Sequence, residues 1–192
     1  DGRAFALSGG PFGAGRGFVM MLGLIRGTGV GAGMVWRGVL IGEPHSIAGE
    51  IGHVAAPLAV CGDLPVIACG CGRSACYEAY ASGPGLSRLA MHYSGETLSP
   101  MEIADQKSKN PAVKMAWEKW GEIVAEMIIT SSFHIAPDVV VLGGGLSKID
   151  GFSAFVKGWD PSFLKEVMLL SINYPIRIGA ASVMPGDVVL AK

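Results

Sequence analysis

The sequence predicts an α/β domain, and three observations support this prediction. The apolar run "FVMMLGLI" at residues 18–25 is typical of a buried strand. The β-branched run "DVVVLGGG" at residues 138–145 is typical of a strand buried on both faces of a sheet. A long segment with helical periodicity lies between them. Strands that alternate with helices indicate an α/β domain, and 192 residues suffice for one core of good size or two small ones.

The first part of the chain is expected to hold strands followed by a long loop. The strand at residues 18–25 leads into a glycine loop, "RGTGVGAG", at residues 26–33. The next segment, "MVWRGVLIG", predicts two short strands around a tight turn at Arg37 and Gly38, because glycine adopts a positive φ without strain. Residues 42–75 show no periodicity and are predicted to be loop.

Three helices are predicted in the second part of the chain. Two short ones span residues 84–93 and 100–107, and the letters "SPME" at residues 99–102, where the second begins, form a capping box with proline at the first helical position. The strongest begins at Asn110 and ends near Pro137, with apolar or small residues at three- and four-residue steps: Val113, Trp117, Trp120, Val124, Met127 and Ser131. Residues 173–192 predict one or two further strands and no closing helix.

Composition and charge argue against several classes of protein. Half of the residues are hydrophobic, and the formal net charge is −1, so neither nucleic acid nor an anionic membrane is an expected partner. The longest apolar runs, such as residues 18–25 and 135–142, are too short to span a bilayer. No basic segment followed by an apolar one opens the sequence, so no secretory signal is expected and the cytoplasm is the expected compartment.

All four cysteines lie in one short segment together with a histidine. Cys69, Cys71 and Cys76 form a C-x-C-x4-C pattern, and His53 lies sixteen residues before the first of them. Three thiolates and a neutral imidazole are a common tetrahedral ligand set for structural zinc. A pair of disulfides is the alternative, although Cys69 and Cys71 are too close to pair comfortably and the sequence has no secretory features. Cys61 is then a spare thiol, interpreted as a small buried or loop residue.

Two carboxylates and the glycine loop are not explained by a zinc site. Glu50 and Glu78 flank the cysteine segment, and they are either solvated surface groups or groups aimed at a polyhydroxylated ligand. Glycine accounts for 29 of the 192 residues, about twice the usual frequency. A glycine loop after a strand either exposes N–H groups to an anion or forms a plain structural turn, and the residues alone leave both open.

Four segments together resemble the ROK family of bacterial sugar kinases and sugar-responsive repressors. They read "GTGVGAGMVWRGVLIG", "AGEIGH", "CGCGRSACYEAYASGPGL" and "PDVVVLGGGLS", in the family's order and with its approximate spacings. The resemblance covers roughly residues 1–147, and residues 148–192 match poorly. Within the family the sequence is most similar to bacterial N-acetylglucosamine kinase, with fructokinase-type members next.

The resemblance implies an actin-like ATPase (ribonuclease H-like) fold. Residues 1–192 would form mainly the C-terminal lobe of a two-lobed sugar kinase, with residues 49–80 as an inserted zinc- and sugar-binding segment. ATP and Mg²⁺ would act as the substrate pair and zinc would be structural. The ATP phosphates would face Gly27, Thr28, Gly29, Val30 and Gly31, and the adenosine would face Gly143, Gly144 and Gly145.

The same resemblance assigns the sugar site and the catalytic base. Glu50, His53 and Glu78 would bind the sugar, one nitrogen of His53 binding zinc while the other bonds a sugar hydroxyl. Asp1 aligns with the aspartate of the family's Asn-Asp-x-Asn motif and would take the proton of the sugar 6-hydroxyl as its oxygen attacks the γ-phosphate. Alternatively, Asp1 marks only the start of the sequence. Arg3 stands where the second asparagine of the motif is expected.

The implied function is ATP-dependent phosphorylation of an amino sugar or hexose at the 6-hydroxyl, above all conversion of N-acetylglucosamine to its 6-phosphate. The expected partners are a small-molecule sugar and ATP, with a homodimer as the candidate assembly. The D-x-G-x-T phosphate motif of the family's N-terminal lobe is absent, so the isolated chain is expected to be inactive. The alternatives are the sugar-sensing domain of a ROK-type repressor, a fructokinase-type enzyme and a non-binding structural remnant.

Overall fold

The computed structural model describes residues 2–9, 13, 15–42, 47–149 and 152, and the backbone of four short strands beyond them. In this described part, six strands form one mixed sheet in the order β3-β2-β1-β4-β8-β5. β2 pairs antiparallel with β1 on one side and with β3 on the other, and β4 runs parallel to β1. The bounds of these four strands are Met20–Arg26 for β1, Val30–Trp36 for β2, Val39–Leu40 for β3 and Val139–Gly143 for β4. Helices cover both faces, which confirms the α/β prediction.

The β1–β2–β3 meander follows the sequence prediction except in the extent of its glycine loop. The predicted turn at Arg37 and Gly38 is confirmed, with φ values of 50° and 79°. The loop predicted over residues 26–33 is wrong in part, because only three residues separate β1 from β2 and the rest belong to strands. Glycine in β2 serves close packing here: a Cβ at Gly33 would lie 2.7 Å from the Cβ of Ala6.

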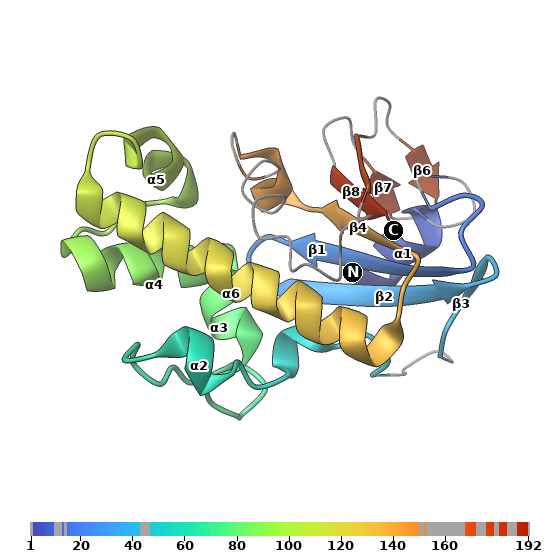
Figure 1. Ribbon diagram of the computed structural model, residues 1–192, viewed down its shortest axis with the longest axis horizontal. Helices are drawn as coiled ribbons and strands as arrows, with labels where there is room; N and C mark the ends of the chain where they lie inside the picture. The colour runs from blue at the N-terminus through green and yellow to red at the C-terminus, as the bar shows by residue number, and fades with distance from the viewer. Residues whose placement is uncertain are drawn as a thin grey trace.

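The larger core lies between the sheet and the long helix α6 (Pro111–Ile135), which crosses one face of the sheet (Figure 1). The helix begins where the sequence predicts, and the side chain of Asn110 caps it by accepting from the backbone N–H groups of its first turn. At one end of α6 the chain adds α4 (Gly83–Ser94) and α5 (Pro100–Gln106), and the latter has the predicted capping box. The short helix α3 spans Tyr77–Ala81.

The opposite face of the sheet is covered by α1 (Gly2–Gly9), a helix that the residues alone did not predict. Its Phe5 and Ala6 form a second, smaller core with apolar residues of β1, β2 and β4. Gly2 lies directly against β2, since a Cβ on it would come within 2.5 Å of the Ala32 nitrogen. Asp1, the predicted catalytic base, lies outside the described residues.

The segment predicted as loop over residues 42–75 contains two short helical turns among its described residues, η1 (Ile51–His53) and α2 (Leu58–Cys61). The end of the chain holds more strands than the one or two predicted, because three lie within residues 173–192: β6 (Ile176–Ile178), β7 (Ala181–Val183) and β8 (Val188–Ala191), with β5 (Met168–Ser171) before them. β8 pairs with β4 and so extends the sheet. Among the described residues, no helix has the length and apolarity needed to cross a membrane.

Candidate functional site

His53, Cys69, Cys71 and Cys76 converge into one cluster, as the sequence predicts. Their ligand atoms all lie within 4.8 Å of one another. The Sγ atoms of Cys71 and Cys76 are 3.7 Å apart, and Cys69 Sγ is 3.5 Å from His53 Nδ1. A tetrahedral zinc ion with Zn–S bonds of about 2.3 Å separates its sulfur ligands by about 3.8 Å, close to the separation of the Cys71 and Cys76 sulfur atoms. All four cysteines of the chain are free thiols, and no disulfide forms.

A tight turn brings the three cysteines together. Cys69 N–H donates to Arg73 O at 2.7 Å, and Gly72 N–H donates back to Cys69 O at 3.0 Å. Gly72 has a φ of 86°, in the left-handed region that glycine adopts without strain. Cys76 comes after this turn and is the residue directly before α3. The last cysteine of the cluster is therefore attached to a helix of the core.

The thiols of the cluster differ in their tendency to ionise. Burial raises the pKa of the Cys76 thiol to about 12, whereas a hydrogen bond from the Arg73 backbone lowers the pKa of Cys71. At neutral pH such a thiol keeps its proton unless a metal ion binds the sulfur. Cys61 lies apart, buried in α2, and its pKa is also raised by burial, in agreement with its interpretation as a spare buried residue.

The imidazole of His53 has two distinct sides. Nδ1 faces the sulfur of Cys69, while Nε2 faces Glu50 Oε2 at 3.9 Å. The two side chains are 33% and 45% exposed, respectively, so a ligand can reach both of them. The structure therefore brings Glu50 and His53 together and leaves Nε2 as the nitrogen that can contact a ligand when Nδ1 binds a metal.

Glu78 joins the cluster to the glycine turn. Its Oε2 accepts a hydrogen bond from the Val30 backbone N–H at 2.9 Å, and its Oε1 lies 3.8 Å from the Cys69 sulfur. A Cβ at Gly29 would come within 2.7 Å of the same Oε2, so Gly29 leaves room for the carboxylate. Because the Val30 amide is occupied by Glu78, it is not free to bind a phosphate.

The turn between β1 and β2 is held on its other side by α4. Gly27 N–H donates to Gly29 O at 3.0 Å, and Gly27 O accepts from Gly83 N–H at 2.8 Å, where α4 begins. A Cβ at Gly27 would meet nothing within 4 Å, and Thr28 is exposed. The turn therefore presents Gly27 and Thr28 to open space, while Val30 and Gly31 belong to β2.

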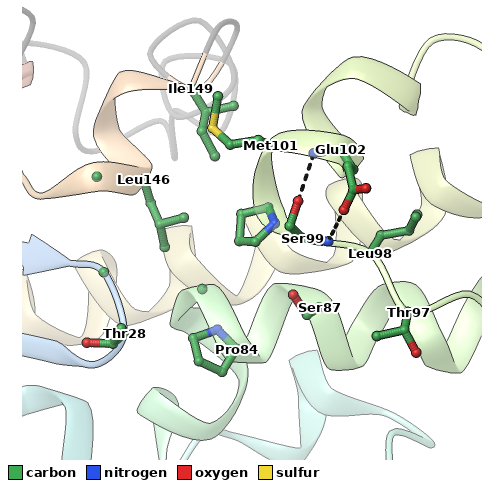
Figure 2. A pocket seen from close by; sticks show the side chains of 14 residues that line it. Thr28, Pro84, Ser87, Thr97, Leu98, Ser99, Met101, Glu102, Leu146 and Ile149 are labelled. Atoms are coloured by element: carbon green, nitrogen blue, oxygen red, sulfur yellow. Dashed lines mark hydrogen bonds between the residues drawn. The ribbon is translucent and has the colours of Figure 1, made fainter.

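A pocket of about 680 Å³ opens beside this turn. Figure 2 shows it between the turn with Thr28, helix α4, the start of α5 and the segment after β4. Its volume is within the range of small-molecule sites, and its largely apolar wall suits a flat heterocycle. The pocket is lined by Gly27, Thr28, Gly83, Pro84, Ser87, Thr97, Leu98, Ser99, Pro100, Met101, Glu102, Gly145, Leu146 and Ile149.

The three glycines after β4 have different reasons to lack a side chain. A Cβ at Gly143 would lie 2.5 Å from the Phe5 ring, and one at Gly144 would lie 2.3 Å from Arg26 O. Gly144 also has a φ of 90°. A Cβ at Gly145 would meet nothing within 4 Å, and this residue lines the pocket. The first two glycines are therefore explained by packing, and only Gly145 borders the pocket.

The far wall of the pocket is not predicted by the sequence. That wall comes from α4 and α5, where the capping-box bonds of 3.3 Å and 2.8 Å between Ser99 and Glu102, drawn in Figure 2, fix the start of α5. The "SPME" motif predicts this helix start but carries no signal for a pocket. The Ser99 hydroxyl also lowers the pKa of Glu102 through its hydrogen bond, so this carboxylate has a structural role.

Arg26 also lies in a position that differs from the sequence prediction. Interpreted from sequence as the start of the glycine loop, it ends β1 with its side chain fully buried. In the part of the chain that the structure describes, none of its three guanidinium nitrogens has a hydrogen-bond partner. The guanidinium stacks on Phe152 at 4.1 Å and on Trp120 at 5.5 Å, and burial lowers its pKa to about 9.

Comparison with known proteins gives consistent matches. The ROK family profile matches residues 1–171. The chain is 37% identical over 153 residues to N-acetylgalactosamine kinase AgaK of Shewanella sp. (strain ANA-3), covering 78% of this chain and 50% of that protein. It is 38% identical over 136 residues to N-acetyl-D-glucosamine kinase of Vibrio cholerae, covering 68% and 45%. The ROK hexokinase structure from Thermus thermophilus superposes with a TM-score of 0.74 at 27% identity, covering 86% of this chain and 56% of that one.

Proposed function

The chain belongs to the ROK family, and from this premise we propose that it forms the C-terminal lobe of an ATP-dependent sugar kinase. The proposed reaction transfers the γ-phosphoryl group of ATP to the 6-hydroxyl of an amino sugar, with N-acetylglucosamine as the first candidate. The names of the two relatives, kinases for N-acetylgalactosamine and N-acetyl-D-glucosamine, support an amino sugar. The chain spans about half the length of these relatives, so the activity is proposed for a complete two-lobed protein.

One observation carries the proposal: the glycine turn is shared by two different candidate sites. On one side Gly27 and Thr28 border the apolar pocket. On the other side Glu78 holds the Val30 amide and lies beside the cluster that contains His53. A nucleotide in the pocket and a sugar at the cluster would then meet at the turn, as direct phosphoryl transfer requires.

For the sugar, the proposed ligands are Glu50, Glu78 and the Nε2 atom of His53. Carboxylates accept hydrogen bonds from hydroxyl groups, and charge assistance makes these bonds strong. Zinc, when bound by Nδ1 and the three thiolates, would fix the tautomer and the direction of the imidazole and would take no part in phosphoryl transfer. The separation of the two ring nitrogens, one facing Cys69 and one facing Glu50, supports this division.

For the nucleotide, the proposed site is the pocket with Gly145 on its wall and the turn at its edge. The apolar wall suits adenine, and the exposed Thr28 at the tip of the turn suits phosphate oxygens. Mg²⁺ supplies charge neutralisation when it accompanies ATP. Asp1 remains the proposed base for the sugar 6-hydroxyl, and Gly2, its neighbour in sequence, lies against Ala32 of β2, close to the turn.

The test measures ligand binding and turnover in the protein that contains this chain. Calorimetry with ATP and Mg²⁺, and a coupled assay of ADP release, would compare N-acetylglucosamine, N-acetylgalactosamine, glucose and fructose. We expect ADP release that depends on an N-acetylated hexosamine. Sugar binding without ATP binding or ADP release would refute a kinase and indicate the sugar-sensing domain of a ROK-type repressor. A preference for fructose would indicate a fructokinase-type enzyme instead.

A further inference from the structure

One carboxylate connects the cluster of His53 and the three cysteines to the glycine turn. Glu78 lies two residues after Cys76 at the start of α3, and its Oε2 accepts from the Val30 N–H. Its Oε1 accepts from the Cys69 thiol, a bond that uses the proton that zinc would displace, so the link to a bound metal runs through the backbone between Cys76 and Glu78. We propose that Glu78 is a positioning residue that makes the order of the glycine turn depend on the cluster of His53 and the three cysteines.

Two independent contacts hold Val30 between segments that carry metal ligands. The amide of Val30 is held by Glu78, which lies two residues after Cys76 at the start of α3. The carbonyl of Val30 is covered by η1, because a Cβ at Gly52 would come within 2.5 Å of Val30 O. Gly52 is the residue before His53. A metal ion that binds His53 and Cys76 would therefore fix both segments that enclose Val30.

The turn has few contacts of its own to keep it in place. Apart from its pairing with β1, the backbone of Val30 and Gly29 is braced by the Glu78 carboxylate, and Gly27 is held by Gly83 at the start of α4. Gly27 and Gly29 have no side chains that could pack, and glycine loses more conformational freedom than any other residue when it is ordered. Removal of the Glu78 contact would therefore loosen the turn more than it loosens the sheet.

The inference deepens the proposed function, since order in the turn affects phosphoryl transfer only if the turn faces ATP. The coupling itself can be measured without any substrate. The suitable readout is the hydrogen-exchange rate of the Val30 amide and its neighbours in the turn, because opening a side-chain hydrogen bond exposes that amide to solvent.

The experiment compares exchange rates in the zinc-loaded full chain, the chelator-treated chain, and the variants Glu78→Ala and Glu78→Gln. We expect metal removal and Glu78→Ala each to accelerate exchange at Val30 by about tenfold or more, as loss of a charge-assisted hydrogen bond implies. Glu78→Gln keeps an acceptor oxygen and is expected to show a smaller acceleration. Exchange in β4 and α6 serves as the internal reference for global unfolding and is expected to stay unchanged.

The decisive comparison is metal removal in the Glu78→Ala background. If Glu78 carries the coupling, chelation adds little to exchange at Val30 in this variant, because contacting groups in one network are not additive. Equal acceleration by chelation with and without Glu78 would overturn the proposal, as would a Val30 amide that does not respond to chelation, or a chain that binds no metal. Glu118→Gln is the matched control and is expected to leave exchange at Val30 unchanged, since Glu118 lies on the exposed side of α6 and pairs with Lys114. Failure of the kinase assay with intact coupling would refute only the proposed function.

Discussion

Replacing Arg26 with leucine is expected to stabilise the fold. The guanidinium is completely buried, has no hydrogen-bond partner among the described residues, and is compensated only by stacking on Phe152 and Trp120. A pKa lowered from 12.5 to about 9 corresponds to roughly 5 kcal/mol against the charged form, at about 1.4 kcal/mol for each pH unit. Stacking of a desolvated cation on an aromatic ring returns about 2 kcal/mol. The net gain expected for Arg26→Leu is therefore about 1–3 kcal/mol, in line with replacements of other buried ions by apolar side chains.

The assay is thermal and urea unfolding at neutral pH, followed by circular dichroism. For a chain of this size, each kcal/mol raises Tm by about 2–4 °C, so the variant should melt several degrees higher. Arg26→Lys, which keeps a charge but loses the planar stacking group, should melt lower than the unmodified chain. Arg16→Leu on the exposed loop serves as the surface control and should change stability by less than about 0.5 kcal/mol.

The pH dependence gives a second check on the same reasoning. Since the folded pKa of Arg26 lies below its unfolded value, the unfolded chain binds the extra proton between pH 9 and 12.5. The stability of the unmodified chain therefore rises with pH in this window relative to Arg26→Leu, and the difference is largest below pH 9. A leucine variant that melts at or below the unmodified chain at neutral pH would refute the argument and indicate that stacking outweighs desolvation.

Three further predictions concern the candidate sites. Metal analysis under reducing conditions should find one zinc per chain. The variant Cys61→Ser should retain this zinc, and Cys69→Ser should lose it. A near-absence of metal in the unmodified protein would contradict the assignment of the cluster as a zinc site. Gly145→Leu should abolish nucleotide binding with little change in Tm, whereas Gly144→Ala should lower Tm because its Cβ would strike Arg26 O. A lower Tm for Gly145→Leu with nucleotide binding retained would refute the assignment of Gly145 to the pocket wall. Glu50→Gln should weaken sugar binding by roughly tenfold to a hundredfold in calorimetry, as loss of a charge-assisted bond implies, and unchanged affinity would remove Glu50 from the sugar site.

Local chemistry alone determined several of the elements of this protein. The Asn110 amide caps α6, and the "SPME" motif starts α5 through its capping box. The Arg37–Gly38 turn and the buried strand β4 follow from residue types within a few positions. The cluster could also be predicted, because the C-x-C-x4-C spacing keeps the three cysteines close together, and His53 completes a ligand set typical of structural zinc.

The sequence was less informative where glycine has several uses. Gly143 and Gly144 resemble a ligand-binding loop in sequence, yet packing against Phe5 and Arg26 accounts for both. Gly29 leaves room for a carboxylate, and Gly33 leaves room for α1. An absent side chain carries no record of the atom that approaches it, so only the folded neighbours distinguish these roles.

Only the tertiary structure decided how the candidate sites relate to one another. Glu78 and Val30 are 48 positions apart, and their hydrogen bond exists because α3 packs beside the start of β2. The pocket joins the turn, α4, α5 and the segment after β4, none of which encloses a volume by itself. Arg26 is polar in sequence and fully buried in the fold, because the position before the turn faces α6. Residue spacing limits contacts within a few positions, whereas contacts between distant segments depend on how the helices and the sheet pack.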